Sequence, residues 1–151
     1  MNEAIQDLNT VGTLSTSLWR FAELAEMQLE NGDIGAAEVQ LEKALESLKS
    51  TQESWYEPEV YRIAAKIIFQ RPDGDPFAAE EYLHRAIEIA RAQGAKWWEL
   101  RSSVSLARLQ RDTDRRDEAR TLLANIYDWF TEGFDLPDLK EAKALLDELR
   151  R

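Results

Sequence analysis

The chain repeats one helix-packing pattern three times, at intervals of about forty residues. The copies are Ala37-x3-Leu41-x2-Ala44, Ala79-x3-Leu83-x2-Ala86 and Ala119-x3-Leu123-x2-Ile126. Consecutive copies are 42 (79 − 37) and 40 (119 − 79) residues apart. Spacings of four and three place the repeated residues on one face of a helix, where alanine allows a neighbouring helix to come close. Repetition at this period predicts a stacked array of helical hairpins.

A second apolar pattern precedes each copy. It reads Phe21-x2-Leu24-Ala25, Tyr61-x2-Ala64-Ala65 and Ser103-x2-Leu106-Ala107. Each repeat therefore has two helical segments, and no stretch alternates long enough to predict a strand. The sequence predicts an all-α fold, an α-α superhelix of about three hairpins with flanking helices. The expected parts of this single domain (1–151) are a partial leading helix over 1–15, repeats over 16–51, 55–93 and 97–131, and a capping helix over 135–151.

Glycine and proline mark the expected turns. Gly32 allows a left-handed helix end, and Asp33 is placed to cap the helix that follows. Pro58 and Pro76 suit the first turn of a helix, where a missing N–H costs little. Asp135 is the expected N-cap of the last helix, with an acidic residue three positions on. Helices are expected over 2–9, 16–31, 34–51, 58–70, 76–93, 97–112, 115–131 and 136–150.

The overall charge argues against several classes of partner. The 151 residues carry a net charge of −10, which repels a polyanion, so we expect no nucleic-acid partner. No apolar run reaches the roughly 18–20 residues of a membrane span, and the start lacks the basic-then-apolar build of a signal peptide. Cysteine is absent, which excludes disulfides and thiolate metal sites and suits a reducing cytoplasm, the expected location.

The acidic excess is uneven. Residues 1–57 hold 3 basic and 11 acidic side chains, a net charge of −8 (3 − 11). Residues 58–151 hold 16 and 18, a net charge of −2 (16 − 18). The nearly neutral part leaves room for a local basic patch.

Side chains that could support catalysis are sparse. His84 is the only histidine, and it falls in the middle of an expected helix. A serine nucleophile would have to be Ser102, Ser103 or Ser105, yet no nucleophile elbow or oxyanion-loop glycine accompanies them. The glutamates of the first repeat lack a histidine or a facing carboxylate, so we interpret them as solvated charge. We expect no catalytic residue, no metal site and no cofactor.

The repeat pattern resembles the tetratricopeptide repeat, whose signature is W-x2-L-G-x2-Y followed by A-x3-F and A. The matching residues are Phe21, Leu24, Ala25, Ala37, Leu41 and Ala44, then Tyr61, Ala65, Ile68, Ala79, Leu83 and Ala86. The third copy departs from the signature at Ser103 and Gln110, where aromatic residues are usual. The period also exceeds the common one of about 34 residues. The resemblance implies a TPR-like solenoid, but the asparagines of the family's carboxylate clamp are missing, so we do not expect a chaperone-tail receptor.

Two segments resemble a narrower group more closely. Residues 86–101 and 127–143 are similar to the C-terminal repeat region of large bacterial signalling proteins. Those proteins join a class III nucleotide cyclase or a DNA-binding domain to an ATPase core. The resemblance implies the helical array of such a protein, or a free-standing relative. The G-x4-GK[ST] loop and the cyclase region are absent here, so no catalytic residue is carried over.

In stacks of this type the first helix of each hairpin lines a concave surface, which binds peptides or partner helices. We expect on that surface the residues off the packing stripe, at spacings of three and four. These are Trp19, Glu26, Arg62, Lys66, Phe69, Arg101, Arg108 and Arg111. The predicted surface is basic across the last two repeats, which favours an acidic peptide, a C-terminal carboxylate or an acidic helix. Alternatively, these arginines pair with Glu57, Glu59 and Glu99 as ordinary solvated charges.

Two tryptophan motifs support the repeat. Trp55-Tyr56-Glu57 and Trp97-Trp98-Glu99 recur 42 (97 − 55) residues apart, each just before the first helix of a hairpin. This recurrence indicates aromatic side chains wedged between successive hairpins. Trp19 has no such counterpart and is a candidate for exposure on the inner surface.

These observations predict a non-catalytic protein–protein interaction module within bacterial signalling or regulation. It would bind a protein, peptide or partner helix in its concave groove. One alternative is a ligand-sensing regulatory domain of a larger ATPase or cyclase protein. Another is a self-association module, in which an incomplete leading hairpin pairs between copies in a homodimer.

Overall fold

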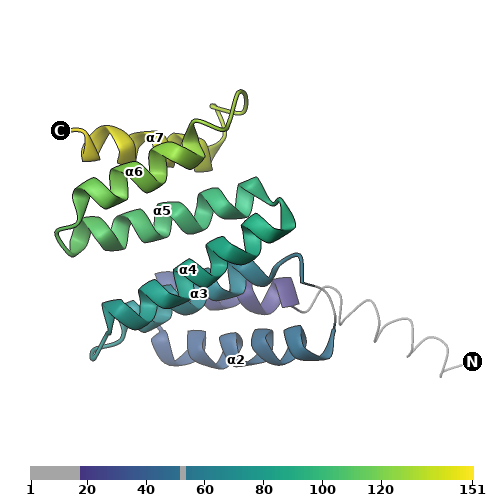
Figure 1. The fold of residues 1–151 in the computed structure, drawn as a ribbon. Helices are drawn as coiled ribbons and strands as arrows, with labels where there is room; N and C mark the ends of the chain where they lie inside the picture. The colour runs from purple at the N-terminus through teal and green to yellow at the C-terminus, as the bar shows by residue number, and fades with distance from the viewer. Residues whose placement is uncertain (1–17, 52–53) are drawn as a thin grey trace, which may run out of the picture.

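The computed structural model describes residues 18–51 and 54–151, and within these ranges it contains helices and no strands (Figure 1). The first described helix covers residues 18–30. It is followed by α2 (Ile34–Ser50), α3 (Glu57–Gln70), α4 (Pro76–Gln93), α5 (Lys96–Asp112), α6 (Arg116–Tyr127) and α7 (Pro137–Leu149). The all-α class is confirmed. The helix expected over 2–9, and the start of the one expected over 16–31, lie outside the described residues.

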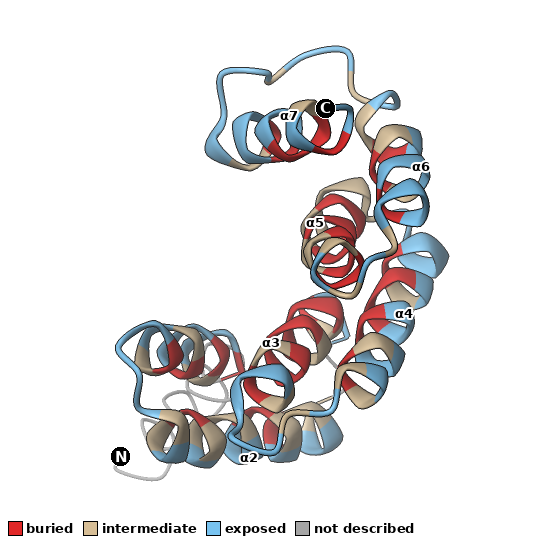
Figure 2. Cartoon of the chain, turned by 90° about the vertical axis from the view of Figure 1, so that its left-hand side faces the viewer, coloured by how far each residue is buried: buried red, intermediate tan, exposed pale blue. Residues whose placement is uncertain are grey.

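The helices form two layers of a curved stack. Figure 2 shows α2, α4 and α6 on the outside and the helix over 18–30, α3, α5 and α7 on the inside. Inner helices touch their inner neighbours, α3 with α5 and α5 with α7, whereas the described parts of α2, α4 and α6 make no contact with one another. The stack therefore curves toward its inner layer, as in an α-α superhelix, and has a concave inner face. None of the described helices combines the length and the apolar character that crossing a bilayer requires.

The repeated alanines occupy equivalent buried positions, as predicted. Ala37 of α2, Ala79 of α4 and Ala119 of α6 are almost completely buried. Each belongs to a core cluster that also holds a buried alanine from the inner helix of the same hairpin: Ala25, Ala65 and Ala107 respectively. Small side chains on both helices allow the two backbones of each hairpin to pack closely.

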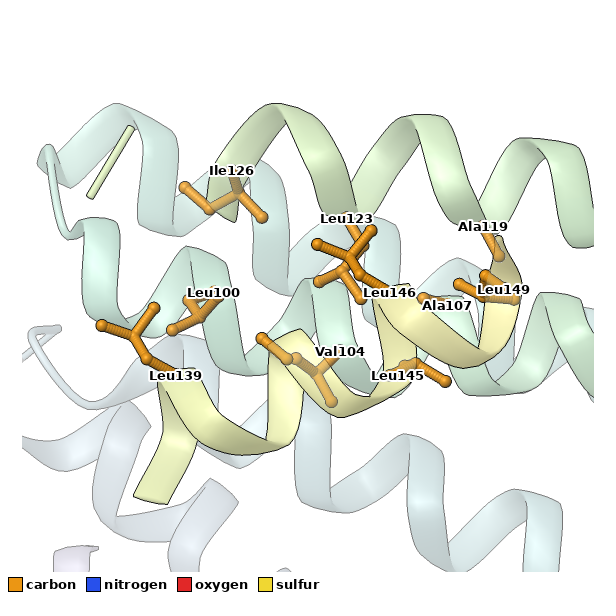
Figure 3. Packing of buried hydrophobic residues seen from close by; sticks show 11 residues of the cluster. Leu100, Val104, Ala107, Ala119, Leu123, Ile126, Leu139, Leu145, Leu146 and Leu149 are labelled. Carbon is orange, nitrogen blue, oxygen red and sulfur yellow. The ribbon is translucent and has the colours of Figure 1, made fainter. Parts of the chain in front are cut away.

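The last helix closes the C-terminal end of the stack. Its buried residues are Leu139, Ala142, Leu145, Leu146 and Leu149, the apolar stripe expected for a cap. Figure 3 shows the four leucines of this stripe against Leu123 and Ile126 of α6 and against Leu100, Val104 and Ala107 of α5. At about 1.5–3 kcal/mol for each buried leucine, the stripe favours docking of α7 by on the order of 6–12 kcal/mol before entropy is counted.

Several predicted helix ends are confirmed. Gly32 has a left-handed φ of 82°, and Asp33 caps α2 by accepting a hydrogen bond of 3.0 Å from the Ala36 N–H. A cap that was not predicted is Asp75 of α4, which accepts a hydrogen bond of 2.9 Å from the Phe77 N–H. Pro58 and Pro76 lie in the first turns of α3 and α4.

The helix expected over 115–131 is shorter, because α6 ends at Tyr127. Beyond it the hydrogen bonds reach back only three residues, from the Trp129 N–H to the Ile126 carbonyl and from the Phe130 N–H to the Tyr127 carbonyl. Gly133 then turns the chain with a φ of 82°. The residues after Tyr127 form a connecting loop rather than a last helical turn.

The capping arrangement expected for the last helix is wrong. The N-cap of α7 is Leu136, which makes no side-chain capping bond, and Pro137 begins the helix. Asp135 therefore lies outside the cap. Asp138, the acidic residue three positions on, instead accepts hydrogen bonds from Arg101 of α5.

A bulky residue at a repeated alanine should break the stack. Ala37→Trp adds a large side chain where the neighbouring helix leaves no space, so we expect a loss of at least about 3 kcal/mol in the free energy of unfolding. Urea denaturation measures the free energy of unfolding. Val39→Trp, at an exposed position of the same helix, is the control and should cost less than about 0.5 kcal/mol. Equal effects of the two substitutions would show that Ala37 is not a point of close approach.

Candidate binding groove

The concave face contains a cavity of about 310 Å³, which we call the groove cavity. All four inner helices contribute residues to its lining. The lining residues are Glu26 and Glu30 from the first described helix, Arg62 and Lys66 from α3, Arg101, Val104, Ser105 and Arg108 from α5, and Asp138 and Glu141 from α7. Five of the eight residues predicted for the concave surface are thus brought together.

Helical spacing explains which side chains reach the cavity. Arg62 and Lys66 are four residues apart on α3, and Arg101, Val104 and Arg108 follow at spacings of three and four on α5. Such residues share one helix face. The opposite faces of both helices are buried in the hairpins, so the groove side chains point into the concavity.

Arg62 is the most buried of the charged residues that line the groove cavity, with 4% of the residue exposed. Its guanidinium donates to both carboxylate oxygens of Glu26, at 3.1 and 2.9 Å. It also donates to Glu59, from Nε at 2.7 Å and from Nη2 at 3.0 Å. Two carboxylates therefore share one buried guanidinium, and one of them comes from the neighbouring inner helix.

Glu59 extends this arrangement across the groove floor. The residue is 1% exposed, and its Oε1 also accepts from Arg101 Nε at 2.7 Å. Arg101 in turn donates from Nη1 to both oxygens of Asp138, at 3.2 Å each. The ion pairs run without a break through the helix over 18–30, α3, α5 and α7. We call this set the groove ion chain: Glu26, Arg62, Glu59, Arg101 and Asp138.

The ion chain changes the acid–base behaviour of its members. Partial burial opposes ionisation of Glu26, but Arg62 and Lys66 outweigh it and lower the pKa of this carboxyl to about 2. Burial likewise disfavours the charged form of Arg62, yet Glu59 and Glu26 raise its pKa above the usual value. Both groups are held in their charged forms at neutral pH.

The groove is not the basic surface that the sequence predicted. Its cavity is lined by four acidic and four basic side chains. Two of the acids, Asp138 and Glu141, belong to α7, and Glu141 accepts from Arg108. The alternative pairing with Glu59 is confirmed for Arg62 and Arg101, whereas Glu99 pairs with Arg91 and Lys96 outside the groove.

The role of α7 in the groove was missed, although the sequence carried a signal for it. Asp138, Glu141 and Glu148 follow one side of the helix beside its leucine stripe. Since that stripe docks against α5 and α6, the acidic side necessarily faces the arginines of α5. Glu148 accepts from Arg111 at 3.1 and 3.3 Å, which completes this set of contacts.

A second, more apolar pocket of about 160 Å³ adjoins the groove cavity, and we call it the Phe69 pocket. The two share Lys66, Ser105 and Arg108. The remaining lining residues are Ala65, Phe69, Gln70, Ala79, Leu83, Leu109, Arg111 and Asp112. Because Lys66, Ser105 and Arg108 line both, the two cavities adjoin and make up one depression, which is polar in the groove cavity and more apolar in the Phe69 pocket.

The predicted site residues are not all in this depression. Phe69 and Arg111 line its apolar end, and Phe69 is 40% exposed. Trp19 is exposed, but it lines neither cavity. Sequence spacing placed Trp19 on the correct helix, yet the cavity begins further along that helix, at Glu26.

The side chains considered for catalysis are not assembled. His84 is exposed on α4, and its Nε2 lies 3.4 Å from Glu80 of the same helix. Ser102 and Ser103 are fully buried and make no hydrogen bond through their hydroxyls. Across residues 18–51 and 54–151, no three histidine, cysteine or acidic side chains are grouped so that they could hold a metal ion.

Comparison with protein-family models, with curated proteins and with solved structures finds no match to this chain.

Glu59 should be the most costly acid to remove. Glu59→Gln leaves the buried guanidinium of Arg62 and the half-buried one of Arg101 without a shared counter-charge, so we expect a loss of about 3–5 kcal/mol in the free energy of unfolding. Glu88→Gln removes one end of an exposed pair with Arg85 and should cost about 0–1 kcal/mol. Urea denaturation gives the free energy of unfolding of both variants. Equal values for Glu59→Gln and Glu88→Gln would contradict a stabilising role of Glu59 in the groove ion chain.

Glu26 should make stability depend on acid pH. Its pKa is lower in the folded protein than the ordinary value of 4.5. The ionised carboxylate thus stabilises the fold above about pH 4.5, and this contribution, on the order of 2–3 kcal/mol, disappears as the pH falls toward 2. The difference in unfolding free energy between wild type and Glu26→Gln should therefore shrink over that range. Glu42→Gln, an exposed acid on α2, controls for the loss of a carboxylate, and an identical pH dependence in both variants would refute the assignment.

Proposed function

We propose that this chain is a non-catalytic interaction module that binds a peptide or a partner helix in its concave groove. The observation that carries the proposal is the depression formed by the adjoining groove cavity and Phe69 pocket. It combines an apolar recess with ordered polar side chains on rigid helices. This combination suits recognition of a protein segment by one anchored side chain and several hydrogen bonds.

The anchor would enter the Phe69 pocket. Phe69, Leu83 and Leu109 supply its apolar walls, and Lys66 and Arg108 lie at the side shared with the groove cavity. A partner with an aliphatic or aromatic side chain beside a carboxylate would fit both features. A carboxylate of the partner would replace the carboxylate of Glu141 as the hydrogen-bond acceptor of Arg108. Glu141 is exposed, so this exchange is easy.

The intramolecular ion chain supports this mode of binding. Side chains that are already held by hydrogen bonds lose little conformational freedom when a partner arrives. The groove offers charges of both signs, so the specificity would come from their positions rather than from the net charge of the partner.

The cellular role that we propose rests on the sequence resemblances. The resemblance to tetratricopeptide repeats and to the repeat region of bacterial signalling proteins favours a cytoplasmic regulatory role. In that setting the groove would recruit a protein partner.

Selection of peptides tests the function directly. A phage-displayed library of random peptides is selected on the wild-type chain, and the affinities of the enriched peptides are measured for two double variants. Phe69→Ala/Arg108→Ala alters the groove and should weaken binding by roughly tenfold or more, the scale of an interface anchor. Arg62 is not used in this test, because its burial among carboxylates means that a substitution there would also destabilise the fold.

The matched control is Phe77→Ala/Arg85→Ala on the outer helix α4. Both side chains are exposed, Phe77 at 76%, so this variant loses the same residue types on the convex face. Peptides that bind both variants alike, or a selection that enriches nothing, would reject the groove as a binding site.

A further inference from the structure

A third cavity, of about 710 Å³, shares no lining residue with the groove cavity or the Phe69 pocket. It lies between the start of α5 and the loop over residues 128–136 that joins α6 to α7. Its walls are Trp97, Trp129, Phe130, Thr131, Glu132, Gly133 and Leu136. We call it the Trp129 pocket.

Three aromatic rings meet edge to face in this pocket. The ring centroids of Trp97 and Phe130 are 5.8 Å apart at 83°, and those of Trp129 and Phe130 are 5.1 Å apart at 85°. Contacts between the rings therefore fix their directions. Trp97 and Phe130 also pack against the core cluster of α5, α6 and α7, whereas Trp129 is 56% exposed. The pocket thus has a rigid base and one open aromatic wall.

The loop that carries Trp129 and Phe130 is acidic. The loop over 128–136 contains the three acids Asp128, Glu132 and Asp135 and no basic residue. Glu132 lines the pocket itself. An aromatic face attracts a positive charge through its quadrupole, and a nearby carboxylate adds to the attraction.

Within the chain, one cation already lies over the Trp129 ring. The ammonium nitrogen of Lys96 lies over this ring, 5.7 Å from its centroid. Lys96 also donates to Glu99 at 3.3 Å, so it is held at the side of α5. It is not among the residues that line the pocket, and Glu132 provides the pocket's own negative charge.

We propose that the Trp129 pocket binds a small organic cation of the quaternary ammonium class. The methyl groups of the cation lie against the indoles of Trp97 and Trp129, and the carboxylate of Glu132 balances its charge. This site is separate from the peptide groove and does not depend on the function proposed for it. Such a ligand suits the pocket because a quaternary ammonium donates no hydrogen bond and needs only aromatic faces and a diffuse negative field.

Choline and its uncharged isostere 3,3-dimethylbutan-1-ol separate cation recognition from simple apolar filling. The indole N–H signals of ¹⁵N-labelled protein report each tryptophan separately. Choline is expected to shift the Trp97 and Trp129 signals saturably, and to bind roughly 2- to 30-fold more tightly than the isostere, the range expected for a cation–π contribution. Equal affinity for both compounds, or no saturable shift with choline, overturns the proposal.

Variants locate the site. Trp129→Leu should abolish the choline-induced shift of Trp97, and Glu132→Gln should weaken choline binding while leaving binding of the isostere unchanged. Trp55→Leu is the matched control, because Trp55 is similarly exposed, at 51%, but lies against Tyr56 and Trp98 in a different aromatic cluster. Loss of binding in the Trp55 variant, or retention of it in a folded Trp129 variant, contradicts the assignment.

Discussion

The carboxylate of Glu59 accepts hydrogen bonds from Arg62 and Arg101, and this shared contact determines the floor of the groove. Without Glu59, the guanidinium groups of Arg62 on α3 and Arg101 on α5 would face each other with no carboxylate between them. Their other contacts reach outward, to Glu26 on one side and to Asp138 on the other. Removing charges from water is costly, and good geometry with several hydrogen bonds is what offsets the cost. The inner helices are thereby held in one relative position, although no large apolar cluster lies on this face.

Different kinds of interaction stabilise the contacts on the two faces of each inner helix. On the hairpin side, alanines such as Ala65 and Ala79 allow close packing, and dispersion and apolar burial dominate. On the concave side, contacts are polar and directional. An apolar face tolerates small shifts between helices, whereas a chain of hydrogen-bonded charges requires one register. The packing therefore holds the stack together, while the ion chain fixes the shape of the groove that it presents.

Periodicity in the sequence was sufficient to predict the helices, the hairpin pairing and the buried alanines, because these follow from local spacing. It also placed five predicted residues in the groove cavity, since side chains three or four apart share a helix face. It failed for Asp138 and Glu141. Their partners Arg101 and Arg108 are 37 and 33 residues away in the chain, and their contacts depend on how α7 rotates as it docks. The short α6 was missed for a similar reason, because the chain after Tyr127 turns so that the Phe130 ring packs against Trp97 of α5, a contact between distant residues that local helix propensity does not reveal.

The position of α7 decides what kind of partner the groove can select. An isolated row of arginines would attract any acidic segment, but α7 already supplies acids to Arg101, Arg108 and Arg111. An incoming partner cannot displace the whole helix, because its buried leucines stabilise docking by on the order of 6–12 kcal/mol. It can replace single exposed pairs such as Arg108–Glu141, since each contributes only about 0–1 kcal/mol. The net charge of a partner therefore contributes little to selectivity. The apolar Phe69 pocket provides the selectivity instead, because only a segment with a side chain that fits this pocket binds well.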